Sequence, residues 1–101
     1  MSKHFQLFLV AALLLVLGCT RYPEVSGEAY EMAETLSTVC NLQNDKQLQE
    51  FRVLISARMD AGQLSESEHA MLTRIADMGE AGDWQLAEME ARQLMLDQAG
   101  R

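Results

Sequence analysis

Downstream of position 27, apolar residues recur at intervals of three and four rather than at every second position. This period is typical of amphipathic helices and argues against strands. We expect four helices, over about residues 28–42, 45–59, 66–78 and 84–98. The residues expected to face inward are Ala29, Met32, Ala33, Leu36, Cys40, Leu48, Phe51, Leu54, Ile55, Met59, Met71, Leu72, Ile75, Met78, Trp84, Ala87, Ala91, Leu94 and Met95.

Local signals mark the helix ends. Three polar side chains stand where N-caps are expected: Asn44 with Gln47 as its reciprocal partner, Ser65 with Glu68, and Asp83. Gly62 suits the left-handed position after a helix, and the stretch from Gly79 to Gly82 is expected to break the third helix. Short turns between these helices favour antiparallel neighbours, so the fold class is all-α: a small bundle of stacked helical hairpins.

The last hairpin, Gly82-Asp83-Trp84-Gln85-Leu86-Ala87, is similar to the start of the second helix in a tetratricopeptide repeat. Only one such unit fits, whereas a repeat array needs several. We interpret it as an ordinary helical hairpin, with a repeat-like peptide groove as the minor alternative.

The N-terminus has the zones of a secretory signal peptide. Lys3 and His4 precede an apolar run from Phe5 to Leu17. About 13 apolar residues are too few for a membrane-spanning helix, which needs roughly 20. Residues 1–18 are therefore predicted to be a cleaved signal.

Val16-Leu17-Gly18-Cys19 resembles the lipobox of bacterial lipoproteins. The resemblance implies that Cys19 receives a diacylglyceryl group, that cleavage precedes it, and that the new N-terminus is acylated. Two or three acyl chains make such an anchor stable. Thr20 favours the outer membrane by the sorting habit of that family. An ordinary secretory signal, with Cys19 incidental, and a cytosolic protein with a buried apolar N-terminal helix are the alternatives.

The predicted organisation is thus a signal peptide at 1–18, a lipidated cysteine and tether at 19–27, and one helical domain at 28–101. The mature chain would have 83 residues, with seven basic residues against fifteen acidic ones and a side-chain charge of −8. Such a charge repels phosphate backbones, so a nucleic-acid partner is not expected. A tether of about eight residues reaches less than 30 Å, which keeps the domain close to its own membrane.

Cys40 has no second cysteine to pair with once Cys19 is lipidated. Its helical spacing from Ala33 and Leu36 favours burial. An intermolecular disulfide, which would make a homodimer, and a redox role are the other two readings.

Candidate chemistry is sparse. His69 lies four residues after Ser65, but a catalytic triad also needs an orienting acid and an oxyanion hole. One histidine and one free cysteine do not make a zinc site. The acid pairs Glu66/Glu68 and Glu88/Glu90 are two residues apart and point to different helix faces. We expect no enzyme, no metal and no cofactor.

Leu86, Met89 and Leu96 form a second apolar stripe on the last helix, which is either core or a surface for a partner. The anchor, the sparse chemistry and this stripe together predict a small lipid-anchored envelope protein that acts as a non-catalytic adaptor or assembly factor for another envelope protein. Cys40-Asn41, with Asp45 following, resembles the Cys-Asn stretch of type II secretion pilotins, whose second cysteine this chain lacks. A pilotin-like escort of a secretion-channel subunit and a carrier of a small apolar ligand or lipid are the alternatives.

Overall fold

The computed structural model describes residues 21–101. Within that range the chain forms four helices: α2 (Gly27–Leu42), α3 (Asp45–Asp60), α4 (Glu66–Glu80) and α5 (Trp84–Leu96). The all-helical prediction is confirmed, and each helix lies within a few residues of its predicted range. The predicted signal peptide, lipobox and lipidation of Cys19 lie outside the described residues.

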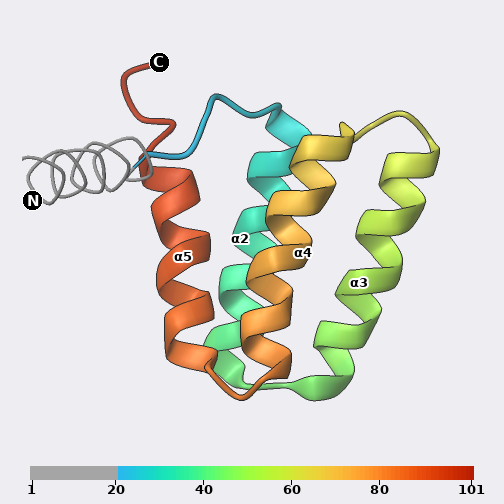
Figure 1. Cartoon of the computed structure of the whole chain (residues 1–101), viewed down its shortest axis with the longest axis vertical. Coiled ribbons are helices and arrows are strands. Elements are labelled where there is room, and N and C mark those ends of the chain that lie inside the picture. The colour runs from blue at the N-terminus through green and yellow to red at the C-terminus, as the bar shows by residue number, and fades with distance from the viewer. Residues whose placement is uncertain (1–20) are drawn as a thin grey trace, which may run out of the picture.

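Consecutive helices run antiparallel, as short turns require (Figure 1). The first and last of the four, α2 and α5, have the most extensive contact. Small buried residues on both of them allow the backbones to approach closely: Ala29, Ala33, Ala87 and Ala91. Helix α3 packs on α4 and α2 but does not reach α5. It is therefore the outermost helix of the described bundle.

The core runs along the middle of the bundle and contains most of the residues predicted to face inward. Leu36, Leu48, Ile55, Leu72, Ile75 and Leu94 are its largest fully buried side chains besides Cys40. Leu54, Met59, Met78, Trp84 and Met95 pack against it while half-buried. Met71 is a correction: it is only half-buried and lines a surface hollow with Tyr22 and Arg74 instead of joining the core.

Two of the three predicted N-caps are confirmed. The Asn44 side chain accepts the backbone N–H of Gln47 at 2.9 Å, although the Gln47 side chain returns no hydrogen bond. Ser65 and Glu68 form the complete capping box. Asp83 occupies the cap position of α5, but its side chain makes no capping hydrogen bond. Its backbone conformation (φ −87°, ψ 56°) differs from the extended conformation of the other N-cap residues, Asn44, Ser65 and Ser26, the last of which caps α2.

The helix breaks are partly as predicted. Gly62 has the expected positive φ of 77°. Gly79, however, does not break α4, which continues to Glu80. A Cβ at Gly79 would lie 3.2 Å from the Trp84 ring and 3.6 Å from the Cys40 sulfur. Glycine is present there because a neighbouring ring packs on the helix backbone. The last helix ends at Leu96, two residues before its predicted end.

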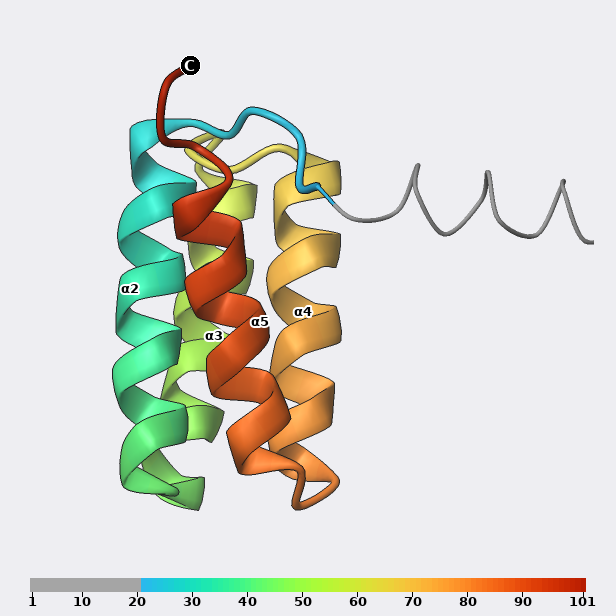
Figure 2. The same cartoon turned by 90° about the vertical axis from the view of Figure 1, so that its left-hand side faces the viewer.

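The segment of residues 21–26, which we call the strap, was predicted to belong to a tether. It instead passes beside α4 and α5 and crosses the end of the bundle to α2 (Figure 2). Tyr22 and Val25 pack against the core cluster. Residues 97–101, just beyond α5, make five hydrogen bonds with it. The strap is thus part of the folded domain, and only residues before it can act as a tether.

Candidate functional site: the exposed face of α5

The three residues predicted to form a partner surface lie on the exposed side of α5. Leu86, Met89 and Leu96 retain 46%, 59% and 66% of their accessible surface. Positions separated by three and ten residues fall on one side of an α-helix. The opposite side of α5 carries Ala87, Ala91 and Leu94 into the core. The structure therefore places the stripe outside the core, on a helix that is apolar on two sides.

Two hollows of about 400–430 Å³ border the stripe. The hollow at its N-terminal end is lined by Leu86 and Trp84 together with Gln43 from the α2–α3 turn. The hollow at its C-terminal end is lined by Leu96, Met95 and Arg92 together with Tyr30 of α2. Both are open to solvent. Tyr30, which is 39% exposed, extends the apolar surface from α5 onto α2.

Tyr22 is the centre of a polar cluster that the sequence analysis missed. Its hydroxyl donates to the Glu90 carboxylate and accepts a hydrogen bond of 2.6 Å from Arg74, whose guanidinium lies 5.7 Å from the ring centroid. Burial, followed by the hydrogen bond to Glu90, raises the pKa of Tyr22 to about 12. The phenol is therefore protonated at physiological pH, and it holds the strap between α4 and α5.

Asp97 fixes the backbone of the strap. Its carboxylate accepts the Tyr22 N–H at 2.7 Å and the Gln93 side-chain amide at 2.6 Å. The hydrogen bond from Tyr22 is the main reason that the pKa of Asp97 lies below its ordinary value. Nearby, Arg101 donates to the Tyr22 carbonyl oxygen at 2.7 Å. The contacts of Tyr22 with Asp97 and Arg101 join residues more than 70 positions apart in the chain, so no local pattern could predict them.

Cys40 is buried, with 1% of its surface exposed. Burial, with a smaller contribution from the Glu88 charge, raises the pKa of its thiol to about 11. A buried protonated thiol reacts slowly because the thiolate is the nucleophile. The intermolecular disulfide stays a prediction, and it would require Cys40 to leave the core.

The serine–histidine pair considered in the sequence analysis does not form between side chains. The Ser65 hydroxyl accepts the Glu68 N–H and contacts Ser67. His69 Nε2 instead lies 3.4 Å from the hydroxyl of Ser56 on α3. No carboxylate hydrogen-bonds to the imidazole within residues 21–101, so the described structure does not assemble a triad there.

In the described part of the chain, no group of three or more histidine, cysteine or acidic side chains is arranged to hold a metal ion. A search of the same residues for membrane-crossing segments finds no helix of sufficient length and apolarity. Comparisons with protein-family models, with curated proteins and with solved structures find no match to this chain.

Proposed function

We propose that this protein is a small lipid-anchored adaptor of the bacterial cell envelope, which binds another envelope protein through the α5 stripe and catalyses no reaction. Lipid on Cys19 would hold it in a membrane. In bacterial lipoproteins the residue after the lipidated cysteine directs sorting, and Thr20 favours the outer membrane, with the domain facing the periplasm. The observation that carries the proposal is the exposure of Leu86, Met89 and Leu96 on one face of a well-packed helix.

Exposed apolar side chains that stand alone are normal on protein surfaces, whereas several gathered on one side of a helix mark an interaction surface. Here Tyr30 and two open hollows extend the stripe. Methionine supports the same reading, because its flexible and polarizable side chain adapts to a partner's shape. An adaptor needs such a surface and does not need catalytic groups.

The strap supports a position close to the membrane. Only Thr20 and Arg21 stand between Cys19 and Tyr22, the first residue whose backbone N–H is bound to the bundle. Three residue steps of at most about 3.6 Å span roughly 11 Å. If Cys19 is lipidated, the domain is held at the membrane surface, and its partner must lie within reach of that surface.

A carrier of an apolar ligand or lipid is the less favoured alternative. A ligand site buries about 70–90% of its ligand's surface. The hollows found on residues 21–101 are open to solvent, so a ligand in them would stay largely exposed.

A pilotin-like escort is a narrower form of the adaptor proposal. Cys40 is the only cysteine in residues 21–101, so the intrachain disulfide of that family has no second cysteine there.

Affinity capture with matched variants tests the proposal. The full chain with a C-terminal tag is expressed in a bacterium, and the membranes are solubilised in detergent. We expect one stoichiometric partner, which is lost in Met89→Glu/Leu96→Glu and retained in Val53→Glu, a control at an equally exposed apolar residue of α3. The mass of the tagged chain itself should show cleavage before Cys19 and added acyl chains. An unmodified mass would refute the anchor, and equal capture by both variants would refute the stripe.

A further inference from the structure

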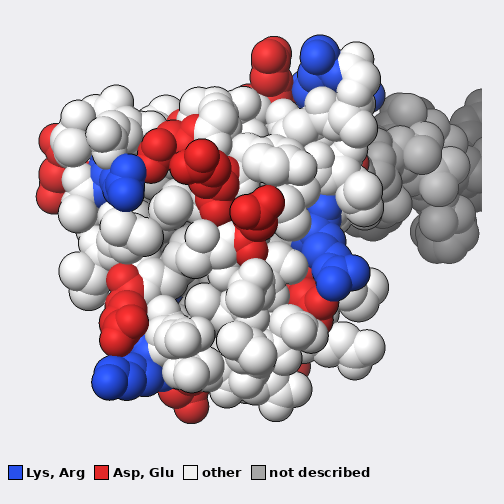
Figure 3. Space-filling model, turned by 180° about the vertical axis from the view of Figure 1, so that it is seen from behind, with Lys and Arg blue, Asp and Glu red and all other residues white. Residues whose placement is uncertain are grey.

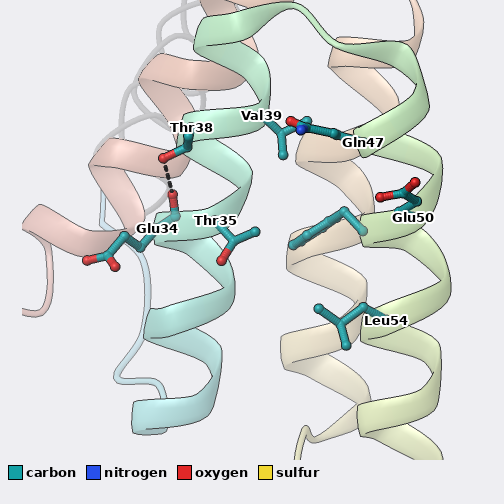
Figure 4. Close-up of a pocket in the computed structure, with 8 residues that line it drawn as sticks. Glu34, Thr35, Thr38, Val39, Gln47, Glu50 and Leu54 are labelled. Atoms are coloured by element: carbon teal, nitrogen blue, oxygen red, sulfur yellow. Dashed lines mark hydrogen bonds between the residues drawn. The ribbon is translucent and has the colours of Figure 1, made fainter.

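A groove lies between α2 and α3, on a different part of the surface from the α5 stripe. Phe51 and Val39, 2% and 6% exposed, form its floor together with the half-buried Leu54. Figure 4 shows Val39 and Leu54 between the two helices. Thr35 of α2 and Leu54 of α3 line it farther from the α2–α3 turn, and Val39 and Gln47 line it nearer that turn. The groove has a volume of about 420 Å³ and is open to solvent. It exists because α3 packs mainly on α4.

Contacts on the other side of α3 hold it in that position. Arg52 donates to Asp77 at 2.7 Å and to Glu80 at 2.9 Å, both on α4. Gln49 adds a hydrogen bond of 2.8 Å to Glu80. These contacts hold α3 against α4. They come from the same turns of α3 whose other side lines the groove. The groove is therefore a fixed feature of the bundle.

The rim of the groove is acidic. Glu34 of α2 and Glu50 of α3 stand on its two sides, and no lysine or arginine is among its lining residues. Four carboxylates of residues 21–101 are ion-paired, such as Glu28 with Arg58 at 2.5 Å, and neither Glu34 nor Glu50 is among them. Acidic side chains lie over both helices on the face seen in Figure 3.

We propose that this groove binds an amphipathic helix of a partner protein, with an apolar stripe bordered by lysine or arginine. The apolar stripe lies on Phe51, Val39 and Leu54, and the basic borders meet Glu34 and Glu50. Threonine and glutamine on the rim supply neutral hydrogen-bonding groups. Helix-in-groove recognition uses this combination of an apolar floor and a polar edge.

The charge of the chain disfavours two other occupants. Residues 21–101 carry seven basic and fifteen acidic side chains, so a second copy would bring a further charge of −8 against the same carboxylates. An anionic lipid surface is repelled for the same reason. A basic helix is attracted, and the two unpaired carboxylates set its position. This inference stands apart from the α5 stripe and from the lipid anchor.

Photo-crosslinking with designed peptides tests the proposal on the full chain as purified from the cell, in a neutral detergent at 0.15 M salt. Two peptides of about 16 residues share one leucine stripe and one photo-reactive residue, and differ only in lysine or glutamate borders. We expect the lysine peptide to crosslink within residues 34–54 and the glutamate peptide to crosslink at least tenfold less.

Charge-reversal variants separate a specific site from general attraction. Glu34→Lys/Glu50→Lys should reduce crosslinking at least tenfold, whereas Glu24→Lys/Asp60→Lys, an equal change of charge at exposed residues outside the groove, should reduce it less than threefold. Circular dichroism checks that both variants keep their helices, and Leu54→Ala tests the floor without a charge change. Equal losses in both double variants, or crosslinks outside residues 34–54, would overturn the proposal. Met89→Glu/Leu96→Glu should leave the crosslinking unchanged, so failure of the groove is distinguishable from failure of the α5 stripe.

Discussion

At the scale of single residues, Glu68 has the most consequential position. It is 9% exposed and accepts the backbone N–H groups of Ser65 at 3.0 Å and of Ser26 at 2.7 Å. Ser65 caps α4 and Ser26 caps α2, so one carboxylate serves the N-termini of two helices. Burial raises the pKa of Glu68, but the hydrogen bonds from the Ser26 and Ser65 backbones lower it by more, and the result lies below the ordinary value.

Glu68→Gln should lower the free energy of unfolding at pH 7 by about 2 kcal/mol, because charged acceptors bind N–H groups more strongly than amides do. A carboxylate with a lowered pKa in the folded state stabilises the fold above its unfolded pKa, near 4.5, and this stabilisation is lost as the pH falls toward the folded pKa. Urea unfolding between pH 7 and pH 3 should therefore show that the free energies of unfolding of the unsubstituted protein and of Glu68→Gln become equal in acid. Glu66→Gln, an exposed first-turn neighbour, is the control. A difference that is independent of pH would contradict this account.

Cys40 makes a second prediction at this scale, about reactivity. Its raised pKa of about 11, against 9.0 for the free thiol, leaves about 100-fold less thiolate at pH 8, and burial limits access further. A colorimetric disulfide reagent should therefore modify the native chain starting at residue 20 at least 100-fold more slowly than the same chain in denaturant. Rapid modification of the native chain would show that Cys40 reaches the surface and would favour the intermolecular disulfide.

At the scale of elements, the strap differs most from its prediction. Polar residues, Pro23 and Gly27 make residues 20–27 read as a tether. The partners that fix this segment, Asp97 and Gln98, lie more than 70 residues away in the chain. Periodicity and capping rules describe local structure, which is why they located the four helices and two of the caps. They contain no information on such long-range hydrogen bonds.

Hydrogen exchange distinguishes a packed strap from a free tether. The amides of Tyr22, Val25 and Ser26 are hydrogen-bonded to side chains of the bundle and should be protected. Tyr22→Ala removes the contacts with Glu90 and Arg74, and should remove that protection and lower the free energy of unfolding by about 2 kcal/mol. Tyr30→Ala, at an exposed tyrosine of α2, should leave the protection of the strap unchanged. Unprotected strap amides in the unsubstituted protein would refute the packing.

At the scale of the whole molecule, sequence reasoning located the α5 stripe but not the α2–α3 groove. The stripe is visible in the sequence because Leu86, Met89 and Leu96 are apolar residues beyond those needed for the inward face of one helix. The groove depends on how far α3 stands from α2, and Arg52 is among the residues that join α3 to α4. Its residues also belong to two helices: Phe51 was predicted simply as core, and Val39 was not predicted to face inward at all.

The most direct test of the central claim, that α5 presents a partner-binding face, is site-specific photo-crosslinking in living cells. A photo-reactive amino acid replaces Met89 in one strain and Val53 of α3 in another, since both positions are well exposed. We predict one dominant adduct from position 89, containing a single envelope protein, and no enriched adduct from position 53. The same diffuse background from both positions would contradict the account.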